Sequence, residues 1–505
     1  MFKYEDPLGV ILSAENTLNE LYATIGITLG SISVTSIVMM IMIFSFPRRD
    51  SLDKEKLLLE IRNWLTTRHK KIKVVRLFFG VEKNRTSGTS REVIVLVIDD
   101  FKVIEEETFD FSGKTFPIIC KLFKFPPLEG AKVTNIEQGI ECNDALYSKF
   151  RKCIRDVSTS KKLFEKHSNL EIISASSYRS KKNGDEIVRE PCIVLYCSCK
   201  GVIPFKESEF PETVNGMNTD VREGFFYQFP KEEYFTNATD VLNPLTMGAS
   251  ISSEDFLKGG TLGGFVSFNT GDIGFITCAH VLFDLSSQCH EKKQFNVVQP
   301  AYSCKRTNNI CGIHHLSCFP QTPYPACTLD VSLVKLTSRI PDRGLFSNLT
   351  AEDVSILENG YNIEEPLEYS DGSVRDFCEN HSAYLRYPCF KIGAKTGFTR
   401  GKLHLNGISV KCFTDPIDVS HTTTPTTVKY YHQLEILGEG ASFSLPGDSG
   451  ALVFQLDSPA TKGEQYRIHC IGMIVGATSD FKTVVTPIGP ILKTLGVKMY
   501  KFDKN

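Results

Sequence analysis

The sequence predicts an all-β double antiparallel barrel over residues 241–505, preceded by a duplicated α+β domain and an N-terminal transmembrane helix. Three observations support this fold class. Short β-runs separated by Gly, Pro, Ser and Asn fill the second half, as an antiparallel barrel requires. Between residues 50 and 240, the same order of predicted elements occurs twice. An uncharged, largely apolar run lies near the N-terminus.

The length and composition are those of a folded protein with several domains. The chain has 505 residues, which exceeds one ordinary hydrophobic core and suggests about three domains. Hydrophobic residues make up 41% of it and charged residues 23%. Because the net charge is only −2 at pH 7, no general attraction to nucleic acid is expected.

Residues 1–23 form an N-terminal tail, and residues 24–46 are predicted to cross a membrane as a helix. No charged residue occurs between positions 23 and 47, and this run is long enough to span a bilayer. Because basic residues follow it directly, at Arg48 and Arg49, the protein is predicted to be membrane-anchored with the rest of the chain in the cytoplasm. Thr and Ser residues dilute the first half of the run, so a buried helix of a soluble domain is the alternative.

Segments 50–140 and 141–240 are predicted to be two copies of one α+β unit. In each copy, an amphipathic helix precedes a strand, a polar turn and a second strand, and the second strands begin at Val93 and Cys192. Pairing the two copies would bury both sheets. Neither copy contains a pattern typical of catalysis, so the segment is predicted to serve as a scaffold or in oligomerisation.

The first of three motifs in the barrel region ends at His280. Two β-runs joined by the turn NTGD lead into the sequence TCAH, and apolar residues follow. A His at the end of a buried strand is usually a satisfied core residue. Here the small residues before it and the apolar residues after it would fix the ring at the rim of a barrel.

The second motif, LDVSLVKL, has Asp330 at the start of an alternating strand. An Asp at a strand start can simply end a sheet. Beside an imidazole, the same carboxylate would hold Nδ1–H, select the tautomer and stabilise the imidazolium.

The third motif, SLPGDSGALVF, places Ser449 between glycines in a tight turn that runs into an apolar strand. The turn would aim the N–H groups of Gly447 and Ser449 at one point, where an oxyanion would develop. A glycine at position 447 leaves that approach unobstructed. The sequence GDSG alone also occurs in ordinary turns.

In this order, the motifs resemble those of the chymotrypsin-like serine proteases of the disulfide-poor, non-digestive type. T-x-A-H is similar to the block of the general base, D-V-S-L-V-K-L to that of the acid, and G-D-S-G to that of the nucleophile. KIGAKTGFTRGKL at 391–403 resembles a hairpin of these enzymes, and VVTPIGPILKTLG resembles their closing strand and C-terminal helix. The resemblance covers residues 245–500, about half of the chain.

The resemblance implies a double antiparallel barrel, the chymotrypsin fold, and a serine endopeptidase that acts on proteins or peptides without a cofactor or metal. The implied catalytic residues are His280, Asp330 and Ser449, with Gly447 and Ser449 as the oxyanion hole. The strand IGMIVGATS is implied to bind substrate main chain, and counting back from the nucleophile gives the specificity pocket. The implied substrate-binding residues are Phe443, Ser444, Val475, Gly476 and Ala477.

The sequence also departs from the digestive enzymes that it resembles. Val281 and Leu445 stand where those enzymes carry cysteines, which favours reduced thiols in the cytosol. Phe443 stands where trypsin-like enzymes have the Asp that selects basic residues. No preference for a basic residue before the cleaved bond can therefore be inferred, and a small or apolar residue there is as well supported. No segment like the activation segment of digestive zymogens is found near Leu245, so either Asp448 needs another partner or neighbouring turns hold the loop, and activity without cleavage is expected. The alternative is a catalytically silent or self-processing interaction protein with the same fold.

Overall fold

The computed structural model describes a large part of the chain. The described residues are 49–68, 74–83, 88–99, 108–123, 128–137, 144–181, 184–228, 240–254, 259–283, 294–301, 309–319, 327–358, 367–376, 385, 387–413, 427–440, 442–457 and 467–502. The predicted tail and transmembrane helix, residues 1–23 and 24–46, lie outside them. Within the described residues, none of the helices combines the length and the apolar character needed to cross a bilayer.

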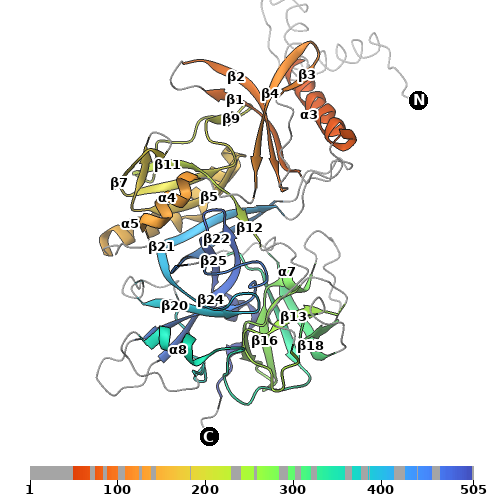
Figure 1. The fold of residues 1–505 in the computed structure, drawn as a ribbon, viewed down its shortest axis with the longest axis vertical. Coiled ribbons are helices and arrows are strands. Elements are labelled where there is room, and N and C mark those ends of the chain that lie inside the picture. The colour runs from red at the N-terminus through yellow and green to blue at the C-terminus, as the bar shows by residue number, and fades with distance from the viewer. Residues whose placement is uncertain are drawn as a thin grey trace, which may run out of the picture. The chain divides into compact units, whose positions relative to one another are not determined.

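The chain divides into two compact units, Met1–Glu60 and Ile61–Asn505. In the first unit, the described part is the beginning of helix α3 (Arg49–Arg68). Every sheet that the described residues form belongs to the second unit (Figure 1).

The first sheet of the second unit has the strand order β3-β4-β2-β1-β9. Its strands are β1 (Val74–Lys83), β2 (Ser90–Ile98), β3 (Thr108–Phe111), β4 (Lys114–Leu122) and β9 (Val202–Pro204), and helix α4 (Leu128–Glu137) follows β4 in the chain. Strand β2 is central because its apolar run is buried from Val93 onward. It pairs antiparallel with β1 and parallel with β4.

The next segment repeats this connectivity. Its elements are α5 (Asp144–Ile154), α6 (Val157–Lys166), β5 (Leu170–Ser176), β6 (Arg179–Lys181), β7 (Glu186–Val188), β8 (Cys192–Cys197), β10 (Thr213–Val214) and β11 (Met217–Glu223). Strand β5 is antiparallel to β8, β8 is parallel to β11, and β10 and β11 form a hairpin. The equivalent pairings in the first sheet are β1 with β2, β2 with β4, and β3 with β4. A common origin of the two copies stays a prediction.

The third sheet closes into an antiparallel ring. Its strands are β13 (Ser250–Ser253), β14 (Gly260–Thr261), β15 (Gly264–Ser267), β16 (Ile273–Thr277), β17 (Asn296–Val298), β18 (Ile310–Cys318), β19 (Val331–Leu336) and β26 (Lys498–Met499). Strands β14 and β15 belong to one run, 260–267, which pairs with β13 at its start and with β16 at its end. Because β13 also leads through β17, β18 and β19 to β16, the ring is complete.

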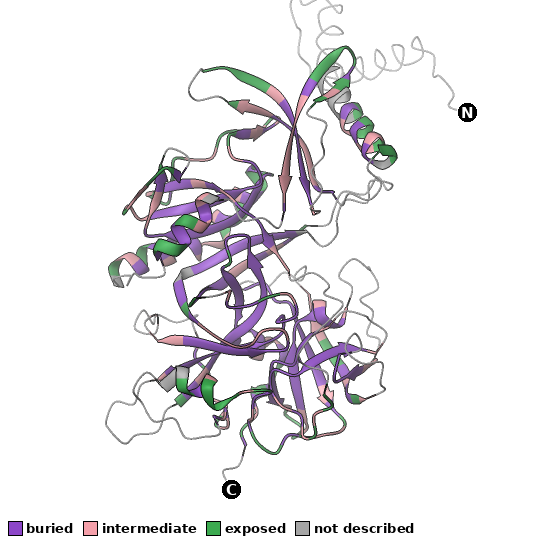
Figure 2. Ribbon diagram, viewed as in Figure 1, coloured by how far each residue is buried: buried purple, intermediate pink, exposed green. Residues whose placement is uncertain are grey.

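The last strands form a second antiparallel ring. They are β20 (Pro388–Gly393), β21 (Gly397–Phe413), β22 (Thr427–Gly438), β23 (Leu452–Asp457), β24 (Arg467–Thr478) and β25 (Thr483–Pro487). They pair in the order β21-β20-β23-β24-β25-β22, and pairing of β22 with β21 closes the ring. Helix α9 (Ile488–Leu495) follows, whereas helix α8 (Ala351–Glu358) lies between the two rings in the chain. The predicted β-barrel architecture is thus confirmed, and most barrel residues are buried in Figure 2.

The barrel and the second α+β copy share one sheet. Strand β21 extends beyond the ring, where Val410 and Ser409 pair with Ile172 and Ile173 of β5. A two-residue strand, β12 (Phe226–Tyr227), then pairs with the end of β24. Phe226 belongs to the same hydrophobic cluster as the residues of both rings.

A buried group of charged side chains also joins helix α4 to the second ring. His404 Nδ1 lies 2.6 Å from Glu435 Oε2, and His404 Nε2 lies 3.3 Å from Glu137 Oε2. Lys482 Nζ lies 3.6 Å and 3.8 Å from the same two carboxylates. Burial opposes the charged imidazole, but the carboxylates outweigh it and raise the pKa of His404 to about 9. Burial likewise opposes the charge of Glu137, yet His404 and Lys482 lower its pKa to about 2.

Candidate active site

His280 is held at the edge of the first ring by its neighbours in the chain. Strand β16 is buried along most of its length and ends at Thr277, and a single helical turn, α7 (Ala279–Leu282), follows. Ala279, Val281 and Leu282 are buried, whereas 11% of the His280 side chain is exposed. The apolar neighbours therefore anchor the turn and leave the ring at the surface, as the sequence predicted.

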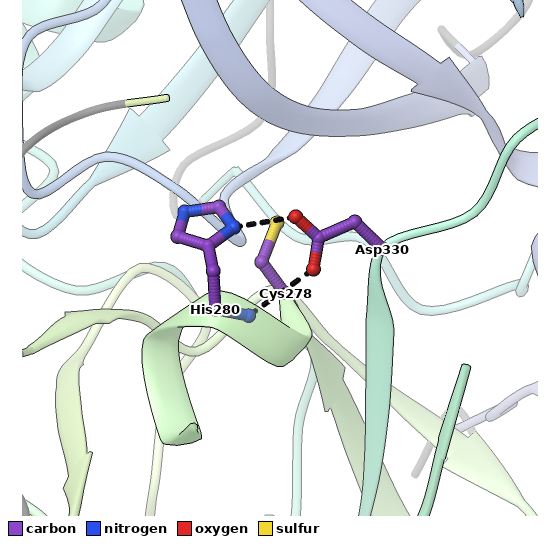
Figure 3. A group of neighbouring side chains, drawn as sticks. All are labelled: Cys278, His280 and Asp330. Atoms are coloured by element: carbon purple, nitrogen blue, oxygen red, sulfur yellow. Dashed lines mark hydrogen bonds and ion pairs between the residues drawn. The ribbon is translucent and has the colours of Figure 1, made fainter. Parts of the chain in front are cut away.

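Asp330 is fully buried directly before strand β19. Its Oδ2 lies 2.6 Å from Nδ1 of His280, and its Oδ1 accepts a hydrogen bond of 3.1 Å from the His280 main-chain N–H (Figure 3). Tyr430 Oη donates to the same Oδ2 at 3.0 Å. Burial alone would raise the pKa of Asp330, but the charge and hydrogen bonds of His280, and the Tyr430 bond, lower it below its usual value.

Ser449 completes the line of hydrogen-bonding groups. Its Oγ lies 2.8 Å from His280 Nε2, so the imidazole connects the serine hydroxyl and the carboxylate. Ser449 stands in a turn between Leu445 and β23 that is tied to the first ring. Thr261 N–H donates to the Ser449 carbonyl at 2.8 Å, and the Thr261 hydroxyl donates to the Gly447 carbonyl at 2.9 Å.

Two glycines allow the turn its shape. Gly447 has φ 106, a backbone conformation that L side chains rarely adopt. Gly450 has φ 92, and a Cβ there would lie 2.3 Å from Thr277 Oγ1. Within the described residues, the N–H groups of Gly447 and Ser449 donate to no other group, so both remain available to a ligand oxygen.

Asp448 has a partner inside the barrel that the sequence left unassigned. Its Oδ2 lies 3.2 Å from Lys391 Nζ of strand β20, and neither side chain is exposed. Asp448 also accepts the Thr396 hydroxyl at 2.7 Å, and the main-chain N–H groups of Lys395, Thr396 and Leu445 at 3.0, 3.2 and 3.0 Å. Burial lowers the pKa of Lys391, and Asp448 opposes that change.

Most of the five predicted substrate-binding residues are engaged in contacts within the protein. Phe443 is fully buried in the core of the second ring, where it packs with residues such as Ala477. Ser444 Oγ hydrogen-bonds Thr483 Oγ1 at 2.6 Å. Val475, Gly476 and Ala477 lie on β24, but Ala477 is paired with Tyr227 of β12. A Cβ on Gly476 would lie 2.4 Å from the Tyr227 carbonyl oxygen.

Sequence reasoning missed three residues of the site: Tyr430, Lys391 and Gln228. Gln228 directly follows β12, and its Nε2 donates to Asp330 Oδ2 at 2.8 Å. Lys391 opens the block KIGAKTG, but no local pattern there indicates its contact with Asp448. Tyr430 and Gln228 have no local motif, because their partner lies 100 and 102 residues away in the chain.

Among the residues that the structure describes, Cys278, His280 and Asp330 form the group that could otherwise hold a metal ion. Their ligand atoms lie within 4.8 Å of one another (Figure 3). Cys278 Sγ donates to the Ile474 carbonyl at 3.1 Å, and burial, followed by the charge of Asp330, raises the pKa of its thiol well above the usual value. Because a thiol binds metal as the thiolate, this donor set suits a hydrogen-bonded relay better than a cation.

Comparison with known proteins gives structural neighbours only. No protein-family model and no curated protein matches the chain. Similar solved structures include a glutamic acid-specific serine protease (14% identity, TM-score 0.28, 51% of this chain and 100% of that one). A second is the Nocardiopsis protease, with 16% identity and a TM-score of 0.30 over 51% of this chain and 98% of that one. A third is Cellulomonas bogoriensis chymotrypsin, with 16% identity and a TM-score of 0.28 over 51% of this chain and 98% of that one. These neighbours are chymotrypsin-like serine proteases, but at such values the function has to rest on the site geometry.

Proposed function

We propose that the chain is a serine endopeptidase, with Ser449 as nucleophile, His280 as general base and Asp330 as the residue that orients the base. One observation carries the proposal. A continuous line of contacts runs from Asp330 Oδ2 through His280 to Ser449 Oγ, with separations of 2.6 and 2.8 Å. A nucleophile, a base and an orienting carboxylate in hydrogen-bond reach are the arrangement that acyl transfer requires.

The geometry supports a two-step mechanism. Ser449 Oγ attacks the carbonyl carbon of a peptide while His280 Nε2 takes the hydroxyl proton. The N–H groups of Gly447 and Ser449 hold the oxygen that becomes negative. His280 then returns the proton to the leaving amine as the C–N bond breaks and the acyl-enzyme remains. Water, deprotonated by His280, attacks the ester, and Ser449 regains its proton as the acid product leaves.

Asp330 serves this cycle without exchanging a proton. Because it accepts from Nδ1, it directs the lone pair of Nε2 toward Ser449. Its buried negative charge stabilises the imidazolium that forms during attack. The hydrogen bonds that Asp330 accepts from His280 and Tyr430 lower its pKa and keep the carboxylate charged over the neutral pH range.

The proposal includes expectations about setting and partners. A protein or peptide would be the substrate, residues 24–46 would tether the enzyme to a membrane with the protease in the cytoplasm, and residues 50–240 would provide a surface for oligomerisation. A second candidate is a protease-fold protein that binds others without cleaving them, or cleaves only itself. The pairing of Tyr227 with Ala477 favours this candidate, since part of the predicted substrate strand is covered.

Hydrolysis of a peptide library distinguishes the candidates. The full-length protein should cleave a subset of peptides, and Ser449→Ala should remove all cleavage. Ser373→Ala is the matched control, because the Ser373 hydroxyl donates to Asp371 in its own loop and its removal should leave cleavage unchanged. A folded wild-type protein that cleaves nothing in the library, or a Ser449→Ala variant that cleaves as well as the wild type, would refute the proposal.

A further inference from the structure

The short strand β12 and the residue after it connect the α+β region to the proposed triad. Phe226 and Tyr227 pair antiparallel with Thr478 and Ala477 at the end of β24. The preceding Phe225 is also fixed, because its N–H donates to Ser479 Oγ at 3.0 Å and its carbonyl accepts from Ser479 N–H at 2.8 Å. Phe225 and Phe226 are both buried. The segment is therefore an integral part of the barrel edge.

This anchoring brings the side chain of Gln228 to the triad. Its Nε2 lies 2.8 Å from Asp330 Oδ2, and it also donates to Tyr430 Oη. Tyr430 in turn donates to Asp330 Oδ2 at 3.0 Å. The reverse orientation of the amide would place its oxygen against the carboxylate, which is repulsive. The N–H side of Gln228 therefore faces Asp330.

We propose that Gln228 is a positioning residue for catalysis: its amide N–H fixes the carboxylate of Asp330 and thereby the imidazole of His280. The inference rests on the proposed function. Asp330 Oδ2 receives three donors, from His280, Tyr430 and Gln228, whereas Oδ1 receives the main-chain N–H of His280. A fully buried carboxylate depends on such donors to stay charged, and hydrogen bonds to a charged group are stronger than neutral ones.

The contact also makes catalysis depend on residues that precede the barrel. Gln228 belongs to the segment 141–240, which precedes the first strand of the barrel, β13. A chain without this region would lose β12, Gln228 and part of the support of Asp330.

The groups that face Asp330 allow a clean pH test. Among the described residues, these are His280 on α7, Cys278 before it, Cys412 on β21 and Tyr430 on β22. Burial raises the pKa of the Cys412 thiol to about 12. Burial, followed by the charge of Asp330, raises the pKa of the Cys278 thiol and of the Tyr430 phenol well above their usual values. Those three groups stay neutral at pH 6–9, and His280 is present in both wild type and variant, so the ratio of their rates reports a carboxyl introduced at position 228.

Labelling by a fluorophosphonate ester measures the effect without a known substrate. In the full-length Gln228→Leu protein, the labelling rate at saturation should fall about 10- to 100-fold, the effect of losing a hydrogen bond to a charged group. The probe concentration at half-saturation should change little. Gln455→Leu is the control, since Gln455 is a buried glutamine of β23 that donates to the Tyr387 carbonyl at 3.2 Å. Gln455→Leu should label like the wild type even if its thermal unfolding midpoint falls as far as that of Gln228→Leu.

Gln228→Glu gives a second test, because the pH dependence of its labelling rate relative to the wild type would not change if Gln228 had only a structural role. A carboxyl beside a buried carboxylate has a raised pKa, so at low pH it is protonated and can donate as the amide does. As pH rises it ionises, loses its donor and repels Asp330. The ratio of variant to wild-type labelling rates should therefore be close to one near pH 6 and fall at least tenfold by pH 9.

The outcomes separate this inference from the proposed function. A wild-type protein that is folded but not labelled refutes both. A labelled wild type with a Gln228→Leu variant of equal rate, or a Gln228→Glu ratio that does not vary with pH, refutes the role of Gln228 alone. A faster Gln228→Leu variant also refutes it, because the Gln228 side chain would then slow labelling instead of supporting it. If Gln228→Leu does not fold, the pH ratio of Gln228→Glu decides.

Discussion

Replacement of Lys391 by methionine removes the cation beside the nucleophile turn and leaves Asp448 buried without its charge partner. The two groups lie 3.2 Å apart with neither side chain exposed. Lys391 also donates to the Gly397 carbonyl at 2.9 Å and to the Thr396 hydroxyl. Methionine fills a similar volume, so the change isolates charge and hydrogen bonding from packing.

The expected loss of stability follows from that burial. Removing one partner of a buried pair costs about 3–5 kcal/mol, because the remaining charge is uncompensated. Asp448 keeps its bonds from Thr396, Lys395 and Leu445, so the loss should fall toward the lower end. If the turn relaxes, Gly447 and Ser449 no longer aim their N–H groups together, and the labelling rate should fall about a hundredfold.

Urea unfolding and fluorophosphonate labelling measure the two effects on one preparation. Lys335→Met is the matched control, because Lys335 pairs with Asp272 at 2.7 Å on an exposed surface and such pairs contribute little. The double variant Lys391→Met/Asp448→Asn should be more stable than the sum of the single changes predicts, since no unpaired charge remains. If Lys391→Met unfolds within about 1 kcal/mol of the wild type and labels at its rate, the pair does not hold the turn.

The other predictions concern the turn and the charged cluster. Gly447→Ala, at φ 106, should reduce labelling at least tenfold, whereas Gly440→Ala, at φ 78 with open space around it, should cost stability alone; equal labelling of the two would contradict the oxyanion role. His404, with its pKa raised from 6.5 to about 9, contributes stability that is fully present below pH 6.5 and lost as pH rises through 9. Urea unfolding should show this decline, and His404→Gln should abolish it. Glu137, with its pKa lowered from 4.5 to about 2, should contribute stability that disappears as pH falls from 4.5 toward 2, and Glu137→Gln should flatten that limb.

The sequence predicted those features that local patterns encode. His280 follows a buried strand, Asp330 opens an alternating one, and Ser449 stands in a glycine turn, so each could be found from its neighbours. The repeated order of strands between residues 50 and 240 was visible for the same reason. The structure adds that both copies use the same pairing of strands.

The features that the sequence could not predict are contacts between distant segments. Lys391 and Asp448 are 57 residues apart, and Gln228 and Asp330 are 102 apart. The pairing of β5 with β21, which joins the α+β region to the barrel, depends on the length of β21 beyond the ring. Neither Phe226 nor Tyr227 carries a motif, so the covering of β24 by β12 appears only in three dimensions.

Intact-mass analysis of the full-length protein after treatment with a fluorophosphonate ester tests the proposed triad most directly. The expected result is one phosphonyl group per chain, located on Ser449 by peptide mapping. The adduct should be absent from Ser449→Ala and strongly reduced in His280→Ala, since Ser449 Oγ then lacks the base that lies 2.8 Å away. A folded protein that gains no adduct, or that gains the same adduct without Ser449, would contradict the account.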